Sequence, residues 1–144
     1  MIDFFSKEEE QQIIQAIASA EMQTSGEIRV HLTRQSEKDI MQNALRIFHK
    51  LEMHKTAQRN GVLILLAPRA RQFAIIGDEG INQAVPPNFW QTERDILLEH
   101  FQRKAYGEGV SKVIEQIGEK LRTFFPRQDD DVNELSDEIS YDDD

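Results

Sequence analysis

Apolar residues recur along the chain with two different periods, which predict alternating helices and strands in its first half. A capping-box pattern at residues 6–9 precedes apolar residues at helical spacing, so we expect a helix over about residues 7–23. Residues 27–33 alternate between polar and apolar side chains directly after Ser25-Gly26, as in a strand with one buried face. A second capping signal at residues 36–39 begins an apolar stripe that predicts a helix over about residues 40–51.

The middle of the chain predicts a buried strand and a hairpin. Residues 62–67 form a continuous apolar run, which is typical of a strand covered on both faces. A turn at residues 68–71 leads to a second apolar run that ends at Gly77 and predicts an antiparallel partner. Because a strand, a helix and a strand follow one another over residues 27–67, the two strands should be parallel with a right-handed crossover. We therefore predict an α/β fold with a mixed sheet.

The last third of the apolar pattern is helical. Beyond Pro86-Pro87, the spacing predicts one or two turns and a long helix, which Tyr106-Gly107 interrupts. Residues 110–124 then repeat apolar side chains at the spacing of a final amphipathic helix. From Pro126 onward the apolar content falls, so we divide the chain into an α/β domain at residues 1–125 and a disordered acidic tail at residues 126–144.

The charge distribution supports this division and limits the classes of partner. The net charge is −9, but residues 128–144 hold nine acids and no Lys or Arg, so residues 1–127 balance 17 acids against 17 basic residues. A neutral body with an acidic tail has little attraction to phosphate backbones, and we expect no nucleic-acid partner. The chain has no cysteine, which excludes disulfides and thiolate chemistry.

The first residues and the hydropathy of the chain indicate where in the cell the protein should be found. The first residues lack the basic start and apolar run of a signal peptide, and we find no apolar stretch of about 18 residues. We therefore expect a cytoplasmic protein without a membrane anchor, and we take it to be a monomer.

Oxygen-bearing side chains stand at three turns that the predicted topology brings to one edge of the sheet. Glu27 begins the first strand beside Ser25, Asn60 precedes the second, and Asp78-Glu79 follow the antiparallel third. Carboxylates and amide carbonyls are the ligands that Ca²⁺ and Mg²⁺ select. We weigh this hypothesis evenly against a simpler interpretation, in which these acids are solvated turn residues or helix caps.

Four blocks of this sequence resemble the TPM domain, also called the TPM phosphatase family, over about residues 4–125. The blocks are residues 25–30 (SGEIRV), 60–64 (NGVLI), 73–82 (FAIIGDEGIN) and 101–109 (FQRKAYGEG). The resemblance implies a three-layer α/β/α sandwich with helices on both faces of a mixed, mostly parallel sheet. It also implies an acidic divalent-cation site at the sheet edge and, as in plant plastid members, acid phosphatase activity. By position, Glu27, Asp78 and Glu79 match the acid-rich blocks.

The sequence departs from this family at its fourth block. Many relatives carry an acid just before the tyrosine, where this chain has Ala105, and a glycine where it has Lys104. The missing carboxylate argues against phosphatase activity more strongly than against cation binding.

Three hypotheses for function follow. The first is binding of Ca²⁺, with Mg²⁺ as competitor, through Glu27, Asn60, Asp78 and Glu79. The second makes the same rim a metal-dependent phosphatase acting on phosphomonoesters. The third is a non-enzymatic assembly or chaperone-like adaptor whose protein partner would contact Trp90. For Trp90 itself we favour the simpler interpretation, in which it covers the open end of the core together with Phe89. The four histidines lack the spacing of a zinc site.

Overall fold

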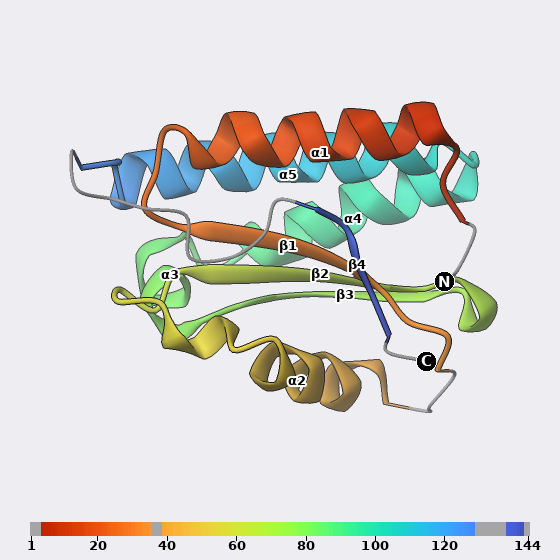
Figure 1. Ribbon diagram of the computed structural model, residues 1–144, viewed down its shortest axis with the longest axis horizontal. Coiled ribbons are helices and arrows are strands. Elements are labelled where there is room, and N and C mark those ends of the chain that lie inside the picture. Colours follow the sequence, from red (N-terminus) through yellow and green to blue (C-terminus); the bar gives the residue numbers. More distant parts are fainter. Residues whose placement is uncertain (1–3, 36–38, 129–137, 143–144) are drawn as a thin grey trace.

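The computed structural model of the protein describes residues 4–35, 39–128 and 138–142, which form the elements labelled in Figure 1. In chain order they are α1 (Lys7–Glu21), β1 (Glu27–Leu32), α2 (Ile40–Lys50), the 3₁₀ turn η1 (Met53–Lys55), β2 (Gly61–Ala67), η2 (Pro68–Ala70), β3 (Gln72–Gly77), α3 (Glu79–Ala84), α4 (Phe89–Gln102), α5 (Tyr106–Phe124) and β4 (Ser140–Tyr141). None of the described helices is both long and apolar enough to cross a membrane.

The sheet has the strand order β3-β2-β1-β4 and is mixed but mostly parallel. β1 runs parallel to β2, with Glu27 opposite Gly61, and β2 runs antiparallel to β3, with Val62 opposite Gly77. This pairing confirms the predicted parallel strand pair and the hairpin. It also places the start of β1, the start of β2 and the end of β3 at one edge of the sheet.

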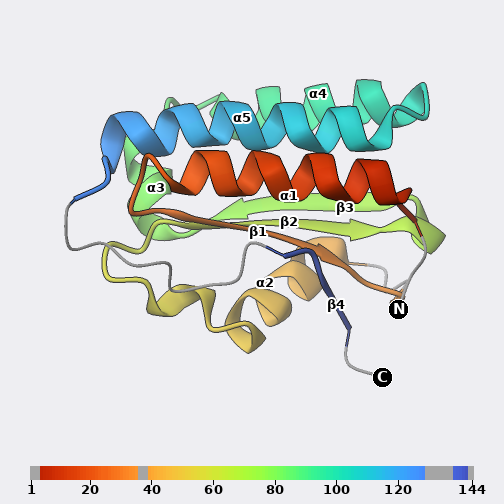
Figure 2. The ribbon, with the colours of Figure 1, turned by 45° about the horizontal axis from the view of Figure 1, so that its top comes forward.

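Helices cover both faces of the sheet, so the predicted three-layer α/β/α fold is confirmed. α1, α4 and α5 lie on one face and α2 on the other (Figures 1 and 2). Ile28, Val30 and Leu32 of β1 belong to the larger core, beneath α1 and α5. The smaller core packs side chains of α2, such as Ala44 and Phe48, against the opposite face.

β2 is the central strand because its side chains serve both cores. Val62, Ile64 and Leu66 point into the larger core, and Leu63 and Leu65 into the smaller one. All seven residues of β2 are buried. Since burial of one large aliphatic side chain contributes about 1.5–3 kcal/mol, this strand supplies much of the energy that holds the layers together.

Local signals fix the helix starts as the sequence predicts. At α1, Glu9 N donates to Ser6 Oγ at 3.1 Å and Ser6 N donates to Glu9 Oε1 at 2.9 Å, which completes the capping box. Asp39 caps α2 by accepting from the amides of Met41 and Gln42. The rest of that predicted capping signal, residues 36–38, lies outside the described residues.

The prediction of a disordered tail over residues 126–144 does not hold where the structure describes this segment. Pro126 pairs with Thr24 in an isolated antiparallel bridge, and β4 joins the sheet parallel to β1. Ile139 is 9% exposed and lies in the larger core. One apolar side chain and two paired residues are too short a signal to stand out in an acidic segment. Residues 129–137 and 143–144 lie outside the described residues.

Candidate functional site

Backbone hydrogen bonds connect the three turns at residues 25–27, 58–61 and 77–80, which together are called the rim. Glu27 N donates to Asn60 O at 3.4 Å, Asp78 N to Gly61 O at 2.9 Å, and Gly80 N to Arg59 O at 2.9 Å. The three turns that the topology was expected to bring together therefore do meet, at the end of the sheet drawn on the left in Figure 1.

The inner part of the rim holds polar side chains that are shielded from water. Glu27 is 2% exposed and Asn60 is 1% exposed. Asn60 Nδ2 donates to Ser25 Oγ at 3.2 Å, whereas its carbonyl oxygen Oδ1 is buried without a hydrogen-bond partner among the described residues. Leaving a buried carbonyl oxygen unsatisfied costs about 1–3 kcal/mol, so this atom is a point where a ligand would be stabilising.

The outer part of the rim is an ion-pair cluster centred on Arg59. Its guanidinium donates two hydrogen bonds to Asp78, from Nε to Oδ2 at 2.7 Å and from Nη2 to Oδ1 at 2.9 Å. A third hydrogen bond runs from Nη1 to Glu79 Oε1 at 3.3 Å. These carboxylates raise the pKa of Arg59, chiefly through the hydrogen bonds that Arg59 donates to Asp78. A bidentate Arg–carboxylate pair is among the stronger polar contacts in proteins.

Asp78 also acts as the cap that the simpler interpretation predicted. Its carboxylate accepts from Glu79 N at 2.8 Å and begins α3 as the N-cap residue. Asp78 thus caps a helix and also lies on the same rim as Glu27 and Asn60. Glu79 is the most open of the four predicted residues, with 64% of its side chain exposed.

The sequence pattern at the three turns points to neither Arg59 nor Glu21, although both contribute to this end of the sheet. Arg59 stands directly before Asn60-Gly61 and has a left-handed backbone, with φ of 53°. Glu21 ends α1, is 1% exposed, and accepts from Ile28 N at 2.8 Å through Oε2. A charged residue beside an Asn-Gly turn is a weak signal, and an acid at the end of a helix looks like solvated surface.

The residues of the rim fit a divalent cation by donor type, with one restriction. Glu27, Asn60, Asp78 and Glu79 are oxygen donors of the kind that Ca²⁺ takes. Over residues 4–35, 39–128 and 138–142, however, no group of three or more His, Asp or Glu side chains is arranged to hold a metal ion. A cation at this rim would therefore rely on the Asn60 carbonyl and on water as well as on carboxylates.

Trp90, the proposed anchor for a protein partner, is held against the same end of the molecule. Its Nε1 donates to Asn82 Oδ1 at 2.9 Å, and its ring lies 5.0 Å from that of Phe89 in an edge contact. The ring is partly buried and packs on the larger core. This arrangement is what a side chain that covers the open end of the core would show.

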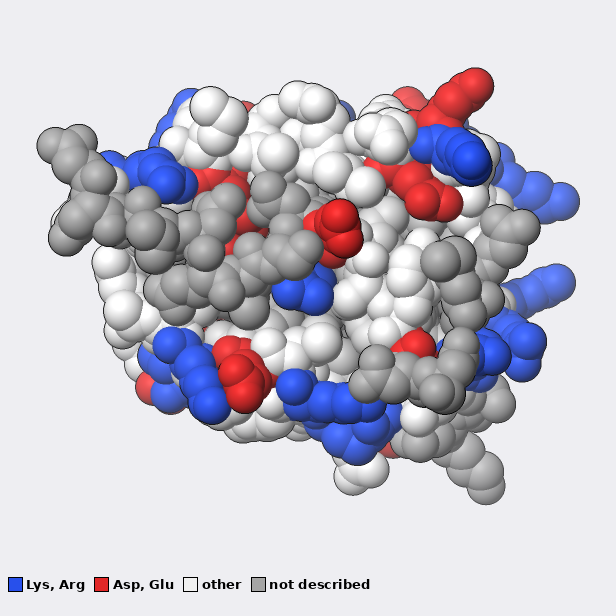
Figure 3. Space-filling view, viewed as in Figure 1, with Lys and Arg blue, Asp and Glu red and all other residues white. Residues whose placement is uncertain are grey.

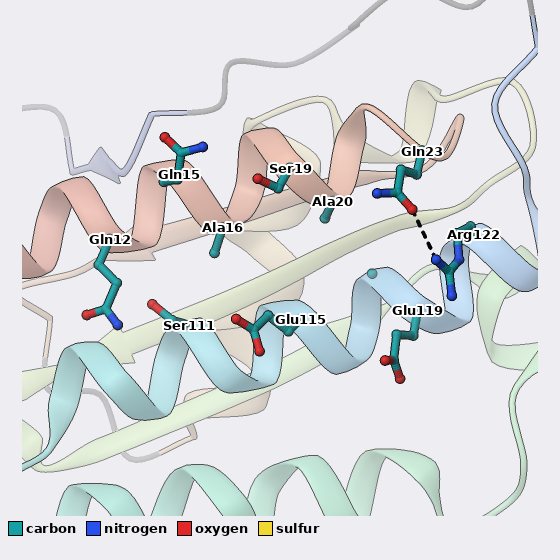
Figure 4. A pocket seen from close by; sticks show the side chains of 11 residues that line it. Gln12, Gln15, Ala16, Ser19, Ala20, Gln23, Ser111, Glu115, Glu119 and Arg122 are labelled. Carbon is teal, nitrogen blue, oxygen red and sulfur yellow. Dashed lines mark hydrogen bonds between the residues drawn. The ribbon is translucent and has the colours of Figure 1, made fainter.

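A separate groove of about 470 Å³ runs between α1 and α5 on the outer face. Figure 4 shows amide and carboxylate side chains along its walls, with Gln23 Oε1 accepting from Arg122 Nη1 at 3.2 Å at one end. Small residues, Ala16, Ala20 and Gly118, form part of its lining. The groove lies away from the rim and contains none of the predicted site residues.

The edge of β1 carries a third polar cluster, built around His31 and the described C-terminal residues. His31 Nδ1 lies 2.7 Å from Ser140 Oγ, and its Nε2 lies 2.9 Å from Asp142 Oδ1. Asp142 Oδ2 also accepts from Thr33 Oγ1 at 2.8 Å and from Arg34 N at 2.9 Å. Because Asp142 is bonded to three residues of the body, His31, Thr33 and Arg34, the cluster anchors β4 to the sheet.

Two charge features of the surface are visible in Figure 3. Acidic and basic side chains are interspersed over most of the face shown, as expected for the balanced charge of the body. Basic side chains project at the right-hand end of this view, where β2 turns into β3 and α4 into α5.

Comparison with known proteins identifies the family. A family model described as the TPM domain matches residues 2–120. The chain belongs to the TPM domain family. A search of curated proteins finds no match to this TPM domain.

Two solved structures are similar to this TPM domain. The NMR structure of the BA42 protein from the psychrophilic bacterium Bizionia argentinensis has a TM-score of 0.89 and 42% sequence identity, over 99% of this chain and 98% of that one. The N-terminal domain of the cg2496 protein from Corynebacterium glutamicum has a TM-score of 0.63 and 14% identity, over 81% of this chain and 74% of that one. The second likeness is one of fold.

Proposed function

We propose that this TPM domain binds a divalent cation, Ca²⁺ with Mg²⁺ as competitor, at the rim formed by Glu27, Asn60, Asp78 and Glu79. The observation that carries the proposal is Asn60 Oδ1, a buried oxygen without a hydrogen-bond partner among the described residues, on a rim that also bears three acids. Ca²⁺ tolerates irregular sets of carboxylate, amide and water oxygens, which suits such a site better than the strict octahedron of Mg²⁺.

Arg59 competes with the cation for the carboxylates of Asp78 and Glu79. Its guanidinium already neutralises Asp78 and contacts Glu79, so a cation must displace at least part of that pair before the carboxylates can coordinate it. The Arg59 side chain is 42% exposed and can swing into solvent, whereas Asp78 is 6% exposed and is held in place as the α3 cap. We therefore expect weak binding, with a Kd of about 10⁻⁴–10⁻³ M.

Two substitutions at this pair should change the affinity in opposite directions. Asp78→Asn keeps a good helix cap but removes a carboxylate, and should weaken Ca²⁺ binding by about tenfold or more. Arg59→Gln removes the competing charge and should tighten binding severalfold. Calorimetry and amide NMR shifts with Ca²⁺, then Mg²⁺, measure both effects on the full chain.

The control is Asp95→Asn, an exposed acid on α4 whose carboxylate accepts from Gln91 within the same helix. This variant should bind Ca²⁺ like the parent protein. The proposal is wrong if Ca²⁺ causes no localised shifts over residues 77–82, or if the Asp78 and Arg59 variants both match the parent.

Hydrolysis of a phosphomonoester at the same rim is a second candidate function, favoured by one observation. Arg59 presents a partly exposed guanidinium beside the cation ligands, and this planar group can hold two phosphoryl oxygens at once. A bound cation would add charge neutralisation at the same oxygens. Turnover of p-nitrophenyl phosphate should then be lost in Arg59→Gln and in the presence of a chelator. Turnover that survives both conditions would exclude the rim as its source.

A further inference from the structure

A cleft of about 390 Å³ opens at the end of the sheet opposite the rim, where β2 turns into β3 and α4 into α5. Its position is the carboxyl end of β2, and crevices outside the carboxyl ends of parallel strands are common ligand sites. The volume falls within the range of small-molecule pockets. The predicted cation site includes none of the residues that line this cleft.

The interior of the cleft is aromatic. Phe101 packs against Phe73 at a ring-centre distance of 5.7 Å and against Tyr106 at 5.1 Å, both in edge contacts, and Phe4 lies 4.7 Å from Tyr106. Leu98, 48% exposed, adds an open apolar side chain to the lining. These side chains are only partly buried, so the walls can still gain by covering an apolar molecule.

Two cations also line this cleft, Arg71 and Lys104. Neither of them has an ion pair or a side-chain hydrogen bond among the described residues, unlike nearby Arg103, which is paired with Glu99 at 2.8 Å. Basic side chains stand out at this end of the molecule in Figure 3. The cleft therefore joins an apolar interior to uncompensated positive charge.

Both cations occupy backbone positions that would suit glycine better. Arg71 has φ of 53° and Lys104 has φ of 61°, in the left-handed region that favours residues without a Cβ. Lys104 follows the end of α4, where Lys104 N donates to Phe101 O and Ala105 N to His100 O, the motif that most often contains glycine. Non-glycine residues in this backbone region cluster at active sites and ligand sites.

We propose that this cleft binds a small amphipathic anion, with its apolar or aromatic body among Phe73, Phe101 and Tyr106 and its acidic head on Arg71 and Lys104. A neutral apolar molecule would leave the two cations unused, and a fully polar anion would leave the rings exposed to water. The combination of both features selects a carboxylate, sulfonate or phosphate that carries an apolar body.

The test compares two fluorescent probes that share a ring system. 8-Anilinonaphthalene-1-sulfonate has the anionic head, and N-phenyl-1-naphthylamine lacks it. In the double variant Arg71→Gly with Lys104→Gly, the affinity for the sulfonate should fall by at least tenfold while the affinity for the neutral probe stays within twofold. Because both glycines relieve a left-handed backbone, the variant should melt at the same or a higher temperature, which separates lost binding from lost folding.

The matched control is Arg69→Ala, on the same turn as Arg71 but outside the cleft lining. It should leave sulfonate binding unchanged. NMR shifts caused by the sulfonate should map to Leu98, Phe73 and Phe101. Any of three results would overturn the proposal: no sulfonate binding up to millimolar concentration, equal losses in Arg69→Ala and the double variant, or shifts that map to the groove between α1 and α5. Cation binding at the rim is measured separately and can fail or succeed independently.

Discussion

Gly80 marks the closest approach between the rim loop and the start of α3. A Cβ at this position would lie 2.2 Å from Gln58 O and 2.6 Å from Arg59 O, and both are backbone atoms that cannot rotate away. The requirement for glycine here is thus steric, because the loop that carries Arg59 and Asn60 passes directly over the helix. The Gly80 N to Arg59 O bond depends on the same closeness.

We predict that Gly80→Ala destabilises the protein by about 1–3 kcal/mol, the usual cost of overpacking. In an ordinary helix interior, replacing glycine by alanine stabilises the protein by about 0.5–1 kcal/mol. Destabilisation by Gly80→Ala would therefore point to the steric contact with the loop. Urea denaturation of the variant and the parent measures the difference. Gln58→Ala, which removes the exposed side chain but keeps the carbonyl, should be nearly neutral. Stabilisation by Gly80→Ala would show that the loop moves aside freely.

At the scale of elements, α4 and α5 enclose an ionisable group in their interface. Glu93 is 1% exposed on α4, and Gln116 of α5, with its amide nitrogen facing Glu93, donates to Oε2 at 2.6 Å and Oε1 at 3.1 Å. Burial raises the pKa of Glu93 to about 7, with a further contribution from Glu119. The folded state therefore holds this proton more tightly than the unfolded chain does.

Because the pKa of Glu93 is raised in the folded state, the free energy of unfolding should fall as the pH rises. The contribution of neutral Glu93 is complete below its ordinary pKa of 4.5 and is lost as the pH rises through about 7. Above that pH, ionised Glu93 costs about 3 kcal/mol. Glu93→Gln should remove this slope and be more stable than the parent at pH 8, with little difference at pH 4.5.

Thermal unfolding at several pH values tests this prediction, with Glu115→Gln as the control. Glu115 is an exposed acid on α5, so its replacement should shift the curve by a constant small amount. If Glu93→Gln and the parent keep the same separation from pH 4.5 to pH 8, the buried carboxyl is not the source of the slope.

On the scale of the whole molecule, β4 closes an edge of the sheet that β1 would otherwise expose. Unpaired edge strands recruit other chains, and a covering segment reduces that hazard. The covering involves His31, whose pKa is lowered by burial and further by Arg29 and Lys50, although the hydrogen bond between its ring and the Asp142 carboxylate acts in the opposite direction. Burial raises the pKa of Asp142. The hydrogen bonds that its carboxylate accepts from His31, Arg34 and Thr33 lower the pKa more, so the pKa is lowered overall.

Docking of β4 should therefore weaken in acid. Burial lowers the pKa of His31 more than the contact with Asp142 raises it, so protonation of His31 opposes the closed arrangement in which β4 covers its ring. Docking should therefore be complete above about pH 6.5 and decline as the pH falls, with a further loss below 3.8 as Asp142 is protonated. Amide hydrogen exchange at Ser140 and Tyr141 should speed up severalfold between pH 7 and pH 5, after correction for intrinsic rates.

A pair of histidine variants separates this effect from general acid destabilisation. His31→Gln should flatten the dependence above pH 5, whereas His49→Gln, an exposed substitution on α2, should keep it. Exchange at Ser140 that stays constant from pH 7 to pH 5 in the parent protein would contradict the role of His31.

The sequence by itself determined the order of the long helices and the main strands and the sheet topology over residues 7–124, but not the short helix α3 (Glu79–Ala84). Apolar period, capping residues and the continuous apolar run of β2 are local or near-local signals, and a strand–helix–strand order leaves few topologies open. It also determined that Glu27, Asn60 and Asp78 would share one edge, because strand direction alone decides which turns meet.

Only the tertiary structure decided what those side chains do there. Arg59 pairs with Asp78, Asn60 Oδ1 is buried without a partner in the described part of the chain, and β4 joins β1 from far along the sequence. Each of these depends on contacts between residues that no local pattern links. Likewise, the rings and cations of the cleft opposite the rim come from the segment before α1, from β3, α4 and α5, and from the β2–β3 and α4–α5 turns. Side-chain pairing is set by packing in three dimensions, whereas periodicity along the chain records only which face of an element is buried.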